Sequence, residues 1–101
     1  MEKLVRHIKS KVGEIGSFET EYALDKGELK FKNGKIDFIG VDFIRVAYDN
    51  NTSECMFYNS LDFDTLLDIF NVVMLYTKKL KYYENYILNK NKRPVLQAFD
   101  I

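Results

Sequence analysis

Few side chains in this sequence carry the chemistry that catalysis or zinc binding requires. His7 is the only histidine and Cys55 the only cysteine, so a histidine-based zinc site and an intrachain disulfide are both implausible. The two residues could form a nucleophilic pair only if the fold joined them, and no supporting motif surrounds either one. We therefore expect a surface histidine and a buried or strand-edge thiol.

Two groups of oxygen-bearing side chains resemble metal sites only in part. The segment 49–54, DNNTSE, begins like a calcium loop, but Glu54 occupies the sixth position, where that loop needs glycine. Asp62, Asp64 and Asp68 could bind magnesium, yet helix capping and the helix dipole also explain them. The sequence has no glycine-rich phosphate loop, no G-x-S-x-G and no H-E-x-x-H. It therefore predicts no enzyme, no cofactor and no metal.

Length and composition favour a single domain. With 101 residues and 47% hydrophobic side chains, we expect one globular domain over 1–101. Fifteen basic and fifteen acidic side chains cancel, which argues against binding to nucleic acid or membrane by bulk charge. The charge is uneven, because residues 36–75 contain one basic and seven acidic side chains, whereas residues 76–101 contain six basic and two acidic ones.

The acidic segment is one candidate surface for a partner. Its proposed contact residues are Asp37, Asp42, Asp49 and Glu54. Together they could present negative charge to a basic protein surface, as mimics of nucleic acid do. The alternative interpretation is a solvated sheet face that binds nothing.

The segment from Tyr76 to Arg93, YTKKLKYYENYILNKNKR, is the other candidate surface. At about 100° per residue on a helix, one face continues the core through Tyr76, Leu80, Tyr83 and Ile87. The face beside it contains Lys78, Lys79, Tyr82, Tyr86 and Asn89. Tyrosines can stack on bases and lysines can displace counterions from phosphate, so this face could bind nucleic acid. It could equally contact a protein, because exposed tyrosines enter interfaces at modest entropic cost.

Hydrophobic periodicity predicts the elements that position these residues. Apolar side chains at helical spacing predict a helix over 2–13, ended by glycine. Alternation predicts a strand over 17–24, and β-rich segments over 41–48 and 54–60 predict two more, the first of them central. The period then changes to 3.6 at Asp62, the expected N-cap of a long helix.

A hairpin over 28–39 is the strongest local signal. Asn33-Gly34 favours a two-residue type I′ turn, which would set Phe31 opposite Ile36. Leu29 and Phe38 would then share the same core-facing side, with Lys30 opposite Asp37 on the other.

The predicted fold class is α+β: an N-terminal helix, an antiparallel meander of about five strands, and a long C-terminal helix packed across one sheet face. A helix of about 27 residues spans about 40 Å and a strand of six about 20 Å, so the helix must overhang its sheet. Overhanging amphipathic surface usually finds a partner or a second copy of itself.

These patterns predict a small non-enzymatic protein-binding module of inhibitor, immunity or regulatory type. The alternative is a nucleic-acid-binding accessory protein that uses the basic-aromatic face of the last helix. A homodimer through Tyr82 and Tyr86 is the favoured assembly, because a self-complementary patch closes with two-fold symmetry. The N-terminal residues lack a signal-peptide core and no segment is long enough to span a bilayer, so we expect a cytoplasmic protein without membrane contact.

Overall fold

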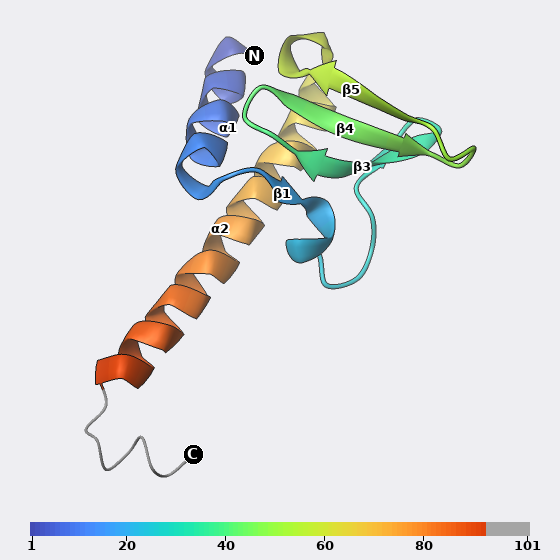
Figure 1. Cartoon of the computed structure of the whole chain (residues 1–101). Helices are drawn as coiled ribbons and strands as arrows, with labels where there is room; N and C mark the ends of the chain where they lie inside the picture. Colours follow the sequence, from blue (N-terminus) through green and yellow to red (C-terminus); the bar gives the residue numbers. More distant parts are fainter. Residues whose placement is uncertain (93–101) are drawn as a thin grey trace.

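The computed structural model has an α+β architecture, as the sequence predicts (Figure 1). It describes the backbone of residues 1–92 and the side chains of residues 1–87; the tail at 95–101, an expected strand or loose end, lies outside this range. The elements are α1 (Glu2–Ile15), β1 (Phe18–Glu19), η1 (Thr20–Tyr22, a 3₁₀ turn), β2 (Lys30–Phe31), β3 (Gly34–Ile39), β4 (Phe43–Tyr48), β5 (Ser53–Phe57), η2 (Tyr58–Ser60) and α2 (Phe63–Lys92).

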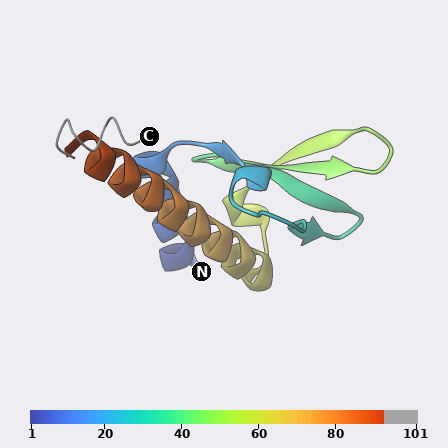
Figure 2. The same ribbon diagram turned by 90° about the horizontal axis from the view of Figure 1, so that it is seen from below.

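All strand pairs of the five-stranded sheet are antiparallel, in the order β1-β3-β4-β5, and β2 also pairs with β3. β4 is therefore central, as expected. Figure 2 shows both helices on the same side of the sheet. The core lies between them and the inward side chains of the sheet, and it includes Ile8, Ile39, Ile44, Leu66 and Val73, each fully buried.

The hairpin between β2 and β3 forms, but its predicted register is wrong. Phe31 lies opposite Gly34 and Lys30 opposite Lys35, so the turn residues are Lys32 and Asn33. Lys32 adopts a positive φ of 50°. Gly34 instead belongs to the strand, where a Cβ would lie 2.5 Å from the Ala47 carbonyl oxygen. Glycine is needed there because β4 approaches closely, and this tertiary demand overrides the turn preference.

The predicted face of Phe38 is also wrong. The register of β3 against β4 shifts between Ile36 and Phe38, which marks a β-bulge. The bulge reverses the alternation of inward and outward side chains, so Ile39 is fully buried in the core and Phe38 is only half-buried. Phe38 contacts Phe43, with ring centroids 5.9 Å apart, and lies 5.3 Å from the guanidinium carbon of Arg45.

The strand predicted over 17–24 is much shorter than expected. Only Phe18 and Glu19 pair with β3, and the chain then turns through η1. The buried Thr20 hydroxyl donates a hydrogen bond to the carbonyl of Ile36 at 2.9 Å, in place of a strand ladder. Strict alternation would place Tyr22 on the same side as the buried Phe18 and Thr20, but the turn buries Ala23 and exposes Tyr22 instead.

α1 is slightly longer than the predicted helix over 2–13. It continues through Gly13 to Ile15 and ends at Gly16, whose φ of 90° suits glycine. Val5, Ile8 and Val12 form its buried side. Lys9 reaches the turn between β3 and β4, where its ammonium lies 3.3 Å from a carboxylate oxygen of Asp42.

α2 begins directly after Asp62, whose carbonyl accepts the first helical hydrogen bond, from Leu66. Its first half packs on α1 and the sheet through Leu66, Ile69, Val72 and Val73. The Tyr76 ring stacks on Phe18 with centroids 4.0 Å apart. Thr77 is the last buried residue of α2 in the described part of the chain.

The core stripe predicted along α2 does not continue to Ile87. Tyr83 and Ile87 are 63% and 54% exposed, because the helix has already left its own sheet and first helix (Figure 1). The overhang expected from helix length is therefore present, but it begins earlier than predicted. We call residues 63–77 the core half of α2 and residues 78–87 the α2 extension.

Candidate functional site

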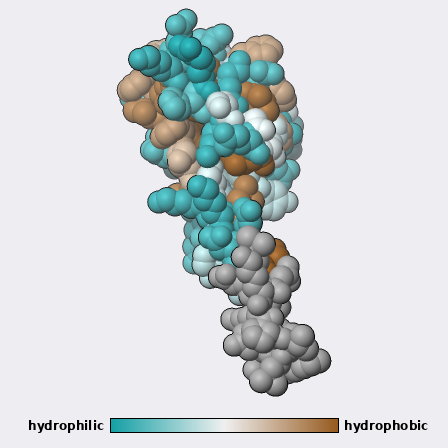
Figure 3. Space-filling model, turned by 90° about the vertical axis from the view of Figure 1, so that its left-hand side faces the viewer, coloured by the Kyte–Doolittle hydropathy of each residue, from teal (hydrophilic) through white to brown (hydrophobic). Residues whose placement is uncertain are grey.

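The α2 extension exposes a cluster of aromatic side chains. Tyr82 is 71% and Tyr86 is 55% exposed, and both lie one helical turn apart as predicted. Tyr82 and Tyr83 contact each other edge to face with centroids 6.3 Å apart. Figure 3 shows this part of α2 extending away from the rest of the chain. Rigid amphipathic rings in this position supply contact area with few rotamers to lose.

η1 supplies the second wall beside the extension. The buried Thr20 fixes the turn, which carries Tyr22 outward toward α2. Lys79 then joins the two elements, since its ammonium forms an ion pair with Asp25 and donates to the Tyr22 carbonyl at 3.4 Å. The result is a groove between the 21–25 segment and α2.

This groove has a volume of about 840 Å³, and more of its lining is apolar than polar. We call it the tyrosine groove; it is lined by Glu21, Tyr22, Asp25, Lys78, Lys79, Tyr82, Tyr83 and Tyr86. Four of the five residues proposed for the basic-aromatic face therefore meet in one place. The fifth, Asn89, belongs to α2 but its side chain lies outside the described residues, as do those of Lys90, Lys92 and Arg93.

The proposed acidic residues do not gather in the same way. Asp37 accepts a hydrogen bond from Arg45 at 2.9 Å, and Asp42 pairs with Lys9 on α1. Glu54 accepts a hydrogen bond from the Tyr48 hydroxyl at 2.8 Å, and Asp49 lies in the loop between β4 and β5. These acids occupy different parts of the sheet, and three of them have partners within the chain.

Two of those contacts also shift the pKa of the donor. The hydrogen bond from Arg45 to Asp37 raises the pKa of the guanidinium. The hydrogen bond to Glu54 raises the pKa of the Tyr48 hydroxyl. In both cases the carboxylate favours the donor that keeps its proton.

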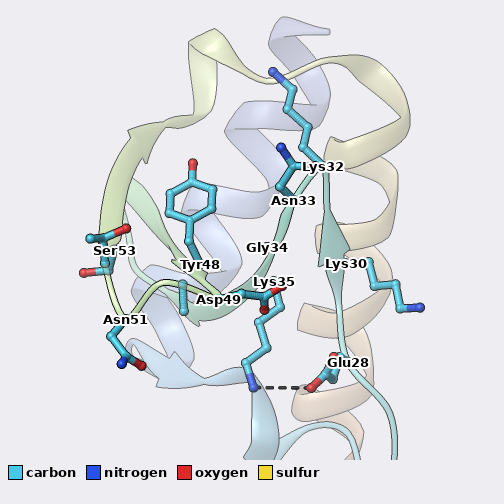
Figure 4. Close-up of a pocket in the computed structure, with 12 residues that line it drawn as sticks. Glu28, Lys30, Lys32, Asn33, Gly34, Lys35, Tyr48, Asp49, Asn51 and Ser53 are labelled. Carbon is cyan, nitrogen blue, oxygen red and sulfur yellow. Dashed lines mark hydrogen bonds and ion pairs between the residues drawn. The ribbon is translucent and has the colours of Figure 1, made fainter.

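A second hollow, of about 700 Å³, lies between the two hairpin tips (Figure 4). Asp49, Asn51 and Ser53, the calcium-like positions, line it, but so do Lys30, Lys32 and Lys35. Lys35 pairs with Glu28 at 3.3 Å, the contact dashed in Figure 4. Three ammonium groups around the same hollow disfavour a divalent cation, and the open polar walls hold no convergent acid-base set.

The side chains that could take part in catalysis or metal binding do not gather in the fold. His7 is exposed on α1, as expected of a surface histidine. Cys55 is exposed on the edge strand β5, which is the strand-edge position, not the buried one, of the two that the sequence left open. Among the described residues, no three His, Cys, Asp or Glu side chains gather as a metal site would require. Every buried side-chain nitrogen or oxygen in that part of the chain has a hydrogen-bond partner.

Comparison with known proteins adds no relative: no protein-family model, curated protein or solved structure matches this chain. Across the helices that the structure describes, none combines the length and apolar character needed to cross a bilayer.

Four residues of the tyrosine groove could not be found by sequence reasoning. Tyr83 is assigned to the core because its helical angle matches the buried stripe, and only the end of the sheet exposes it. Glu21, Tyr22 and Asp25 come from a segment that reads as a strand and turn. Its alternating pattern contains no sign that Thr20 would bond to Ile36 and turn the chain toward α2.

Proposed function

We propose that this chain is a small non-enzymatic protein-binding module, of inhibitor, immunity or regulatory type, and that it binds its partner through the tyrosine groove. The observation that carries the proposal is the meeting of Tyr22, Tyr82, Tyr83 and Tyr86 around one hollow. Exposed tyrosines clustered on a rigid helix are the residues that most often dominate protein interfaces.

The proposed occupant is an amphipathic helix of a partner protein. The exposed apolar side chains of the extension follow helical spacing along one side of α2, at Tyr82, Tyr83, Tyr86 and Ile87. A partner helix aligned with α2 can place its own apolar side chains between these rows, which is the usual helix-in-groove mode of recognition. Lys78 can cover the rim with its aliphatic stem while its charge stays in water.

The charges at the rim favour a protein over a nucleic acid. Glu21 and Asp25 line the groove beside Lys78 and Lys79, so its rim carries both signs. Lys79 is already paired with Asp25. A phosphate backbone approaching here would meet two carboxylates as well as two ammonium groups, and this balance removes much of the counterion-release energy that nucleic-acid binding needs.

A capture experiment with matched variants tests the proposal. The full chain is immobilised as wild type, as Tyr82→Glu/Tyr86→Glu, and as Lys3→Glu/His7→Glu. The last variant is the control, because it also places two glutamates one turn apart on an exposed helix face. Each is exposed to native host lysate with and without nuclease.

We expect a protein that the wild type and the α1 control retain, that the groove variant loses, and that nuclease leaves in place. A photo-crosslinking residue at Tyr82 should join the same protein covalently. Equal retention by the groove variant would contradict the proposal, and retention that nuclease abolishes would favour the nucleic-acid alternative. A homodimer through this face is the alternative assembly, and it predicts a wild-type dimer whose solution mass falls to that of the monomer in Tyr82→Glu/Tyr86→Glu.

A further inference from the structure

The two edges of the sheet differ in how well they are protected. One edge consists of β1 and β2, which are two residues each and lead into η1 and a turn. Short strands and bends are the usual protection against pairing with another chain. The other edge is β5, which has five residues and contains neither proline nor lysine. Figure 1 shows β5 at the border of the sheet, and within residues 1–92 no strand or helix lies beyond it.

The hydrogen-bonding pattern fixes which backbone groups of β5 face outward. Tyr48 donates its N–H to the carbonyl of Thr52 at 2.8 Å, so this pair bonds across the β4–β5 ladder. Bonded and non-bonded pairs alternate in an antiparallel ladder, and Glu54 and Met56 therefore bond to β4. The N–H and C=O groups of Ser53, Cys55 and Phe57 point away from β4. The Phe57 carbonyl already accepts a hydrogen bond from the Ser60 hydroxyl at 2.7 Å, and its second lone pair remains for a partner.

We propose that β5 pairs antiparallel with β5 of a second copy, with the two-fold axis at Cys55. In this register Cys55 faces Cys55 of the second copy. Ser53 faces Phe57 of the second copy, and Phe57 faces its Ser53. Every outward N–H and C=O of the three residues then gains a partner. A shift by two residues in either direction leaves at least one of the three residues without a partner, so the register centred on Cys55 satisfies the most backbone groups.

Side-chain sizes fit the same register. Phe57 is 67% exposed on the face of the sheet opposite to α1 and α2, and its partner on β4 is Phe43. Across the proposed interface it would meet Ser53 of the second copy, whose own neighbour is Ala47. The Phe57 ring thus covers the small side chains of Ser53 and Ala47 in the second copy, and the two-fold axis repeats this contact. Glu54 would lie opposite Met56, so no like charges face each other.

Substitutions at one position test the pairing. Light scattering of the purified full chain is measured from micromolar to millimolar concentration for wild type, Cys55→Ser, Cys55→Lys and Cys55→Pro. We expect wild type and Cys55→Ser to reach twice the chain mass of 11.9 kDa. Cys55→Lys sets two ammonium groups face to face, and Cys55→Pro removes an outward N–H that β4 does not use, so both should stay monomeric. Circular dichroism checks that each variant folds, and Cys55→Lys decides the test if the proline variant does not.

Thiol cross-linking tests the register. Directly opposed residues in a bonded antiparallel pair lie about 5.5 Å apart between Cα atoms, but their Cβ atoms are farther apart than an unstrained disulfide allows. A short bis-maleimide, which bridges two nearby thiols without that geometry, should therefore convert wild type into a covalent dimer. The control is Cys55→Ser/Ser53→Cys, in which the two thiols would lie about 13 Å apart along the strands and should not join.

A wild-type monomer at all concentrations would overturn the proposal, as would a dimer that survives both Cys55→Lys and Cys55→Pro. A dimer lost in Tyr82→Glu/Tyr86→Glu but kept in Cys55→Lys would move the interface to the tyrosine groove and overturn it too. Equal cross-linking at positions 53 and 55 would reject the register.

Discussion

The two halves of α2 show how the same helix can serve a core and a surface. The core half contributes Leu66, Ile69 and Val73, all fully buried, while the extension exposes more than half of each of Tyr82, Tyr83, Tyr86 and Ile87. Both halves present apolar side chains at helical spacing. What separates them is the length of the sheet and of α1, which end before the helix does (Figure 1). Apolar periodicity therefore indicates a helix face that is suited to burial. Only the fold shows whether that face is buried by the same chain or is left for a partner.

The largest expected effect on stability comes from comparing substitutions at two adjacent leucines in the core half of α2. Leu66 is fully buried and Leu67 is 36% exposed. We expect Leu66→Ala to lower the free energy of unfolding by about 2–5 kcal/mol, because it leaves a cavity between α2, α1 and the sheet. Leu67→Ala should cost less than about 1 kcal/mol. Urea denaturation of both variants measures the difference, and equal losses would show that α2 packs in another orientation.

A buried tyrosine provides a test with an intermediate expected loss of stability. Tyr58 is 1% exposed and its hydroxyl donates to the Gly40 carbonyl at 2.6 Å. Tyr58→Phe should cost about 1–3 kcal/mol, because the buried carbonyl loses its donor. Burial raises the pKa of the Tyr58 hydroxyl above its usual value of 10.0.

That raised pKa gives the effect a pH dependence of known sign. The folded state favours the neutral hydroxyl, so the stabilisation is complete below pH 10 and declines as the pH rises above it. The advantage of wild type over Tyr58→Phe should shrink by up to about 1.4 kcal/mol per pH unit in that range. Urea denaturation of both proteins from pH 8 to 11 measures it, and a constant difference would contradict burial of the ionisable hydroxyl.

The smallest expected effect belongs to the extension. Tyr83→Ala should change the free energy of unfolding by no more than about 0.5 kcal/mol, because the ring is already 63% exposed. Tyr76→Ala is the matched substitution in the core half, and it removes the stack on Phe18. Thermal melts of the two variants should differ clearly, and a large loss for Tyr83→Ala would mean that the chain itself covers the extension.

Much of the fold can be predicted from local sequence. The change from alternating to helical spacing at Asp62 locates α2, and the apolar run of residues 41–48 identifies a central strand. Four members of the tyrosine groove, at Lys78, Lys79, Tyr82 and Tyr86, also follow from helical angle alone. These inferences succeed because each depends on residues a few positions apart.

Other features depend on contacts between distant segments. The turn before β3 is displaced because β4 approaches Gly34, and the bulge in β3 turns Phe38 away from the core. The acids of the middle segment are separated, with Asp37 bonded to Arg45 and Asp42 to Lys9. None of these contacts leaves a periodic signal in the sequence, so pattern reasoning fails at them.

Local sequence is sufficient to predict the α+β class, the five strands and a helix too long for its sheet, because hydrophobic period and length are local properties. The tertiary structure decided where the helix leaves its cover, which brings Tyr22 and Asp25 to the tyrosines of α2. It also decided which strand stays at the open edge and which of its backbone groups face outward. Those outcomes depend on strand order and register, which are set by packing between segments far apart in the chain.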